Sequence, residues 1–217
     1  MKNIVIIISV LLIGCGGTTW PENNGRSEIS YNIEDGFSIA ELDMIKEGMA
    51  TWEECGNLKF IEVDNIEEQT TYLIQKGDLN DTTAGTSTIG YDENGDNWLI
   101  LYQVTTRSVL HELGHCLGLK HEHQRYDRSL YVDVDFGNIY FSKWHNFIIF
   151  NNLLYHEYEY QYDYYSIMHY NGYAFAQDTR LPTILPVPVC ILPEDLGSDT
   201  LSELDCLKIE NIYGHPL

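Results

Sequence analysis

Residues 111–121 read HELGHCLGLKH, and the three histidines of this stretch constrain the fold more than any other feature of the chain. His111 and His115 are four residues apart, so on a helix they project from the same face. Gly118 can end that helix, because glycine tolerates the left-handed backbone of a sharp turn. After the turn, His121 can return to the same point. Three neutral imidazoles around one point are the ligand set of a catalytic zinc ion with an open fourth position.

Glu112 lies between the first two histidines. A carboxylate at this place can act as general base on water activated by the zinc ion. The shorter pattern HExxH also occurs by chance, on the order of once in several hundred chains of this length. The competing interpretation is that the histidines only pack or lie on a surface. Gly118 and His121, at metal-ligand spacing, disfavour that interpretation.

The chain has 217 residues, enough for one domain with a core or for two lobes around a cleft. Ser38 and Glu41 have the spacing of a capping box, and apolar residues at helical spacing follow, so a helix is expected to end near Glu54. Two more helices are expected, from about Thr106 to Leu117 and from Ser202 to Gly214. Strands are expected at residues 58–63, 71–75 and 98–102. Residues 129–165 show no clear pattern, and the proline-rich residues 181–193 are expected to be irregular.

The first residues have the pattern of an export signal, with Lys2 before an apolar run from Ile4 to Ile13 that is too short to span a bilayer. Residues 12–15 (LIGC) resemble the lipobox of bacterial lipoproteins. That resemblance implies a signal peptide over residues 1–14, lipidation of Cys15, a tether over residues 15–19 and a folded domain over residues 20–217. The alternative is an ordinary secretory signal with an incidental cysteine. Either interpretation predicts export, and lipidation would anchor the protein to the bacterial cell envelope, with the outer membrane as one location.

The net charge of −21 comes from 33 acidic and 12 basic residues. It disfavours nucleic acid as a partner, because binding to phosphates needs clustered Lys and Arg. It could steer basic substrates towards the protein. Solubility outside the cell is the simpler interpretation.

Four cysteines remain if Cys15 carries lipid, and in an oxidising compartment they allow three complete disulfide pairings. Cys116 points about 100° away from His115 on the helix. We therefore expect a buried free thiol at Cys116. The other cysteines then compete for one disulfide: Cys55, Cys190 and Cys206.

The stretch from His111 to Arg128 resembles the zinc motif of the metzincins, and residues 121–128 (HEHQRYDR) resemble the astacins in particular. Residues 166–170 (SIMHY) resemble the Met-turn of the same family. The resemblance implies that Met168 forms an apolar floor beneath the metal. It also implies that Tyr170 is a mobile fifth ligand, or swings away to stabilise the transition state. Arg125 and Asp127 are expected to hold the loop after the helix of His111 and His115 by charged hydrogen bonds.

The fold that this resemblance implies is α+β: a two-lobed catalytic domain with a twisted, mostly parallel sheet, two long helices above it and an irregular C-terminal lobe below the cleft. The implied activity is that of an endopeptidase with one catalytic zinc ion, acting as a monomer on protein or peptide substrates. An edge strand near residues 85–90 would pair with the extended substrate. The alternative is a catalytically silent, surface-anchored lipoprotein that binds a partner through the same cleft. Glu112 and all three histidines are present, which favours catalysis, and Tyr170 disfavours another metzincin branch.

Some residues depart from the family pattern. Cys55 matches the family's first cysteine, but the C-terminal cysteine after the last helix is missing. Cys206 lies about 13 Å upstream along a helix and is therefore expected to be a poor substitute, with Cys190 as an open alternative. In matured relatives the glutamate at the position of Glu122 helps to anchor a new N-terminus. No segment of propeptide length lies between Cys15 and residue 20, so we expect an enzyme that is active once exported and zinc-loaded.

Overall fold

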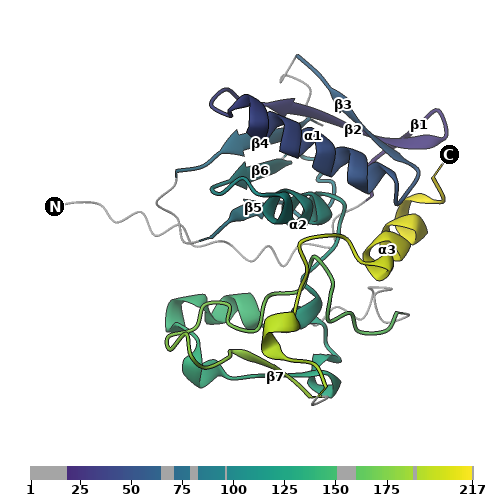
Figure 1. Ribbon diagram of the computed structural model, residues 1–217. Helices are drawn as coiled ribbons and strands as arrows, with labels where there is room; N and C mark the ends of the chain where they lie inside the picture. Colours follow the sequence, from purple (N-terminus) through teal and green to yellow (C-terminus); the bar gives the residue numbers. More distant parts are fainter. Residues whose placement is uncertain are drawn as a thin grey trace.

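A computed structural model describes residues 19–64, 71–78, 83–95, 97–150, 160–187 and 190–216. The predicted signal peptide and Cys15 lie outside these residues. Figure 1 shows an upper lobe with the large sheet and two helices, a lower lobe of short elements, and the last helix beside both. Among the described residues, no helix combines the length and the apolar character that crossing a membrane requires.

The upper lobe contains a six-stranded sheet with the order β1-β2-β4-β6-β5, in which β3 also pairs with β2. The central pairs β2–β3, β2–β4 and β4–β6 are parallel, whereas β1 and β5 are antiparallel to their neighbours. The prediction of a mostly parallel sheet is therefore confirmed. Its strands are β1 (Glu22–Asn23), β2 (Arg26–Ile33), β3 (Leu58–Glu62), β4 (Tyr72–Lys76), β5 (Gly85–Ser87) and β6 (Trp98–Leu101).

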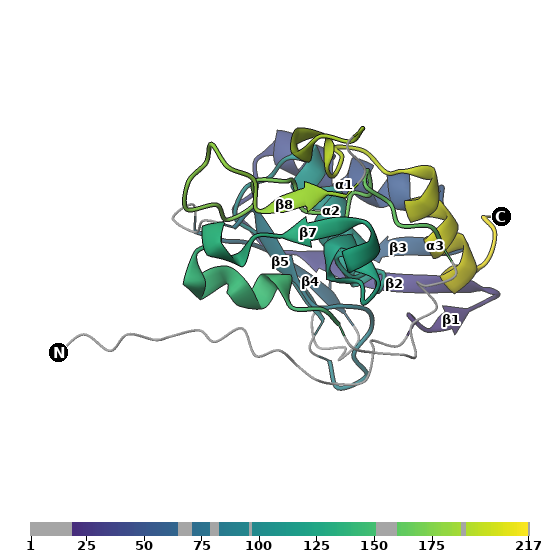
Figure 2. The ribbon, with the colours of Figure 1, turned by 90° about the horizontal axis from the view of Figure 1, so that it is seen from below.

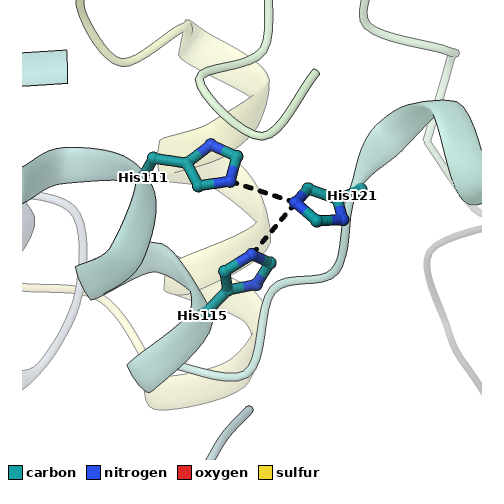
Figure 3. Close-up of side chains that lie close together, drawn as sticks. All are labelled: His111, His115 and His121. Atoms are coloured by element: carbon teal, nitrogen blue, oxygen red, sulfur yellow. Dashed lines mark hydrogen bonds between the residues drawn. The ribbon is translucent and has the colours of Figure 1, made fainter. Parts of the chain in front are cut away.

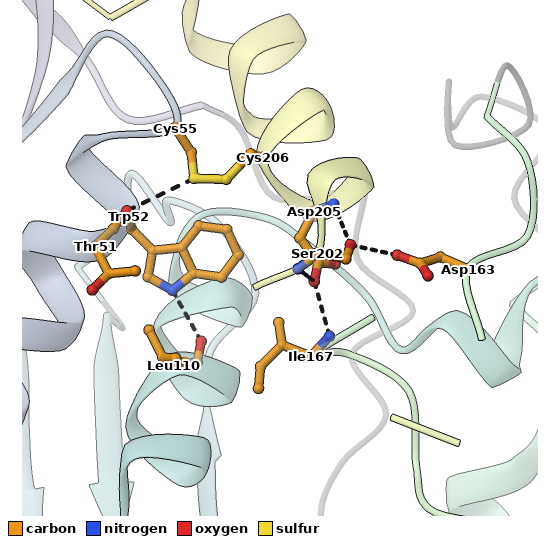
Figure 4. Close-up of a disulfide and its surroundings, with 9 residues drawn as sticks. All are labelled: Thr51, Trp52, Cys55, Leu110, Asp163, Ile167, Ser202, Asp205 and Cys206. Carbon is orange, nitrogen blue, oxygen red and sulfur yellow. Dashed lines mark hydrogen bonds between the residues drawn. A yellow bond between two sulfur atoms is a disulfide. The ribbon is translucent and has the colours of Figure 1, made fainter. Parts of the chain in front are cut away.

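Two helices, α1 (Ile39–Glu53) and α2 (Thr106–Cys116), lie against this sheet (Figure 1). The predicted capping box starts α1: Ser38 N donates to the Glu41 carboxylate at 2.7 Å, and Glu41 N donates to Ser38 Oγ at 3.4 Å. The apolar face of α1 is buried, and the indole of Trp52 donates to Leu110 O of α2 at 3.0 Å (Figure 4). This packing fixes α2, the helix that carries the first two histidines, against the sheet.

The lower lobe has its own small core and a two-stranded ribbon of β7 (Val132–Val134) and β8 (Ile184–Pro186), which Figure 2 shows from below. The expectation that residues 181–193 are irregular was wrong for β8. Pro186 ends the strand opposite Val132 in a ribbon of only two strands, where its missing N–H is tolerated. Short 3-10 helices make up much of the rest: Glu122–Gln124, Arg128–Leu130, Phe136–Asn138, Phe141–Phe147 and Pro193–Asp195.

The last helix, α3 (Glu203–Tyr213), begins at the predicted cap Ser202 and ends at Gly214, whose φ of 85° suits glycine. A disulfide between Cys206 and Cys55 joins α3 to the end of α1 (Figure 4). The expectation that Cys206 is a poor partner was wrong. The helix α3 lies across the end of α1. Cys55 is therefore met by Cys206, a residue within α3, and not by a residue after the helix; the Cα–Cα distance is 4.6 Å. Cys116 is a buried free thiol as predicted, and Cys190 is exposed and free.

Candidate metal centre

Three histidines converge at the C-terminal end of α2, as the sequence predicts (Figure 3). His111 and His115 project from the helix, and Gly118, at φ 98°, turns the chain so that His121 comes back to them. The Nε2 atom of His121 lies 3.1 Å from Nε2 of His111 and 3.2 Å from Nε2 of His115. Nitrogen ligands of a tetrahedral zinc ion would be separated by about 3.4 Å, so the observed spacing fits this ion.

The tautomer of each ring is assigned from the partner of its outer nitrogen. Nδ1 of His111 faces Ile167 O, Nδ1 of His115 faces Leu119 O, and each distance is 2.8 Å. Nδ1 of His121 faces the side-chain oxygen of Gln124, also at 2.8 Å. Each Nδ1 therefore donates a proton outward, and each Nε2 presents a lone pair to the common point. Three converging lone pairs with no proton between them fit a metal cation.

Burial keeps these imidazoles neutral. It is the largest cause that lowers the pKa of His111 to about 3, with the neighbouring His115 as the second cause. Burial also lowers the pKa of His115 to about 4 and that of His121 well below its ordinary value. Neutral imidazole is the form that binds metal ions. The chain therefore holds its ligands in the binding form at physiological pH.

Glu112 is buried beside this cluster, and its Oε2 atom has no hydrogen-bond partner among the described residues. Burial raises the pKa of its carboxyl to about 8. Gly85 of the edge strand β5 lies directly against it: a Cβ added there would be 2.7 Å from Cγ and 2.9 Å from Oε1 of Glu112. The carboxylate is thus confined between α2 and a backbone that has no side chain at this point.

Met168 lies on the other side of α2, with only 1% of its surface exposed. A Cβ added to Gly114 would be 2.5 Å from its sulfur, so the missing side chain at Gly114 lets the thioether pack against the helix. The turn is held from α3, because Asp205 accepts a hydrogen bond from Ser166 Oγ at 2.6 Å. It also accepts one from Ile167 N at 2.9 Å (Figure 4). The same Ile167 supplies the carbonyl that orients His111.

The ring of Tyr170 lies beside the third histidine. Its centroid is 4.6 Å from that of His121 and 4.1 Å from that of His123, on which it stacks. Burial, and after it the charge of Glu112, raises the pKa of Tyr170. The phenol therefore stays protonated and able to donate a hydrogen bond.

Charged residues hold the segment after His121. Arg125 donates two hydrogen bonds to Asp127, from Nε at 2.9 Å and from Nη2 at 2.8 Å. It donates a third from Nη1 to Glu122 at 2.9 Å. It also donates to the carbonyls of Tyr160 and Gln161. The prediction that Arg125 and Asp127 hold this loop is confirmed.

Residues 16–214 match the family described as Astacin, a family of peptidases. The chain belongs to the astacin family. Astacins are metalloendopeptidases with one catalytic zinc ion, so the resemblance inferred from the zinc motif and the Met-turn is confirmed, as is the α+β fold.

Curated relatives and a solved structure agree with this assignment. The low choriolytic enzyme of Oryzias latipes is 31% identical over 203 residues, which cover 89% of this chain and 68% of that protein. An astacin-like metalloendopeptidase from Gallus gallus is also 31% identical, but the alignment covers 93% of this chain and only 47% of that longer protein. The structure of high choriolytic enzyme 1, a hatching enzyme zinc-protease from Oryzias latipes, superposes with a TM-score of 0.75 at 26% identity. The match covers 91% of this astacin and 94% of that chain.

The structure adds contacts to this astacin site that the sequence interpretation did not include. Gln124 orients His121, which caps the single 3-10 turn that ends at Gln124. The spacing of three residues between them can be read from the sequence. Gly85 and Asp205 reach the site from β5 and α3. The sequence gives no local signal for either contact, because each depends on how distant elements pack.

Proposed function

We propose that this astacin hydrolyses peptide bonds within extended protein or peptide substrates, with Glu112 as general base. The observation that carries the proposal is the buried Glu112 carboxyl, whose Oε2 atom has no hydrogen-bond partner among the described residues, next to three histidines whose lone pairs converge. A purely structural carboxylate at such a depth would be expected to have partners. A base must instead keep an oxygen available for a proton.

A zinc ion at the three histidines would supply Lewis acidity, polarising the substrate carbonyl and making water more acidic. Residues of the chain carry out the proton transfers. Glu112 accepts the proton of the attacking water and delivers it to the leaving amine nitrogen. Burial raises the pKa of this carboxyl, so its ionised form is a stronger base than a carboxylate in water, and the positive charge of a zinc ion beside it would favour that ionised form.

Tyr170 is proposed to donate a hydrogen bond to the oxyanion that develops on the substrate. Its ring lies beside His121, and its phenol is protonated at physiological pH. A positioned donor of this kind contributes about 3 kcal/mol to stabilisation of the transition state. The stack with His123 fixes the plane of the Tyr170 ring, and the hydroxyl is the group of this side chain that can donate a hydrogen bond.

The strand β5 is proposed to bind the substrate backbone. It lies at the edge of the sheet, and among the described strands it pairs only with β6. An extended peptide can add to such an edge through main-chain hydrogen bonds. Because Gly85 of this strand lies against Glu112, a peptide bound there would run past the general base.

The test compares cleavage of casein by the wild-type chain and by Glu112→Gln, with and without a chelator. We expect the wild type to cleave casein, the chelator to stop it, and Glu112→Gln to lose at least about 1000-fold while it still binds zinc. Glu47→Gln, at an exposed position of α1, is the matched control and should keep full activity. A zinc-loaded wild type that cuts no member of a broad peptide library would favour the alternative, a silent binding lipoprotein.

The location of the protein is a separate proposal: export and anchoring to the cell envelope through lipidated Cys15. Support comes from the apolar run before the lipobox-like residues 12–15. Metabolic labelling with palmitate in a bacterial host should mark the wild type but not Cys15→Ser. Equal labelling of both would contradict the anchor.

A further inference from the structure

Glu122, which directly follows the third histidine, is the centre of a buried ion cluster behind the metal centre. Its side chain is 1% exposed. One carboxylate oxygen accepts hydrogen bonds from Arg125 Nη1 and from Asp163 N, each at 2.9 Å, and the other accepts from Lys208 Nζ at 2.7 Å. Its backbone N–H donates to Met168 O at 3.1 Å. The residue after the third ligand is thus tied to the Met-turn, to the lower lobe and to α3.

The charges of this cluster show why Lys208 matters. Arg125 uses two of its three nitrogens on Asp127, so this pair is already neutral. The charge of Glu122 is then balanced by Lys208, whose side chain is only 5% exposed. Without the ammonium, a buried carboxylate would be left with a net negative charge, and breaking a buried pair in this way is costly.

The helix α3 reaches a second ligand through a residue one turn before Lys208. Asp205 accepts from Ile167 N, and Ile167 O orients His111. The ammonium of Lys208 also acts on Asp205, where its charge opposes the burial that raises the pKa of that carboxyl. The disulfide at Cys206 fixes the same turn of α3 to α1. One turn of a helix distant in sequence therefore supports two of the three metal ligands.

We propose that Lys208 is a positioning residue for the metal centre: its ammonium holds the Glu122 carboxylate and, with it, the backbone that carries His121. The inference rests on the zinc site of the proposed function but not on catalysis. Its alternative is that Lys208 only docks α3 onto the protein. That role would lower the stability of the zinc-free and zinc-loaded forms equally and leave zinc affinity unchanged.

The experiment measures the zinc dissociation constant of the full chain by competition with a chromogenic chelator. Lys208→Met should raise this constant by about 10-fold, the lower end of the effect of removing a group bonded directly to a metal ligand, because Lys208 acts on His121 through Glu122. Lys208→Arg, which keeps the charge, should stay within about threefold of the wild type. Lys46→Met is the matched control, because Lys46 pairs with Glu62 at 2.9 Å on the surface, where both side chains are 51% exposed. It should leave the constant unchanged.

A double-mutant cycle tests the route through Glu122. In a Glu122→Gln background, Lys208→Met should change the zinc dissociation constant less than about threefold, because no carboxylate remains to be held. If Lys208→Met does not fold, Lys208→Gln, which keeps a hydrogen-bond donor but not the charge, takes its place in the comparison with Lys208→Arg.

Two results overturn the proposal: a zinc dissociation constant within about twofold of the wild type for the neutral variant, or an equal effect in both backgrounds. Zinc affinity is read without any substrate, so the outcome is independent of cleavage. A wild type that binds zinc but cleaves nothing contradicts the endopeptidase proposal, and the zinc measurements still decide the role of Lys208.

Discussion

Gly85 of β5 leaves no room for a side chain next to the proposed general base. In Gly85→Ala the new Cβ would lie 2.7 Å from Cγ, 2.9 Å from Oε1 and 3.0 Å from Cδ of Glu112. Non-bonded carbon atoms are at optimal separation at about 3.5–4.0 Å. The Glu112 side chain must therefore move by about 1 Å, since both the strand and the helix that face each other here are fixed by packing.

The size of this displacement determines the expected loss in kcat. A misplacement of about 1 Å in a catalytic group costs about 100-fold in rate. Gly85→Ala should therefore lower kcat by about 100-fold. The atoms nearest to the new methyl group all belong to Glu112, so zinc affinity should stay within about threefold of the wild type.

The assay follows cleavage of a quenched fluorescent peptide and, in parallel, zinc binding by chelator competition. Gly137→Ala is the control: this glycine is exposed in the lower lobe, and its added Cβ would meet only Asp135 Oδ1, at 3.0 Å. It should keep full activity. If Gly85→Ala keeps kcat within about threefold of the wild type, the position or the role given to Glu112 is wrong.

Three further changes have expected outcomes. Trp52→Phe removes the donor to Leu110 O and should lower the free energy of unfolding by about 1–3 kcal/mol in urea titrations; an unchanged midpoint would contradict that hydrogen bond. Replacing Cys55 and Cys206 by serine opens a link across 151 residues and should cost about 2–5 kcal/mol, whereas equal stability of both proteins would count against this pairing. Gln124→Ala removes the acceptor of His121 Nδ1 and should raise the zinc dissociation constant about 10–100-fold, and no change would show that the contact does not orient the ligand.

The parts of the site that the sequence predicts are those set by short-range geometry. The spacing of His111 and His115 fixes a helix face, and Gly118 adopts the positive φ that the turn to His121 requires. The capping box at Ser38 and the glycine end of α3 are local in the same way. The roles expected of residues 166–170 came from the family resemblance instead, because no local rule connects this turn to a helix more than fifty residues earlier.

The features that the sequence did not predict depend on packing between distant elements. Lys208 meets Glu122 across 86 residues, and nothing in the sequence near either residue indicates the contact. The pairing of Cys206 with Cys55 was misjudged because the distance was counted along α3, whereas the direction in which α3 crosses α1 decides which side chain faces the partner. The prolines of residues 181–193 argued against a strand at β8. The short ribbon accommodates Pro186, because this residue pairs with Val132 at the end of the strand.

The proposed peptidase activity requires one zinc ion held by the three histidines. The most direct test titrates the metal-free chain with zinc and measures peptide cleavage at each ratio of zinc to protein. Cleavage should rise linearly and stop rising at one zinc ion per chain, and His121→Ala should show no such rise. Cleavage by the metal-free chain, or a rate that does not depend on zinc, would contradict it.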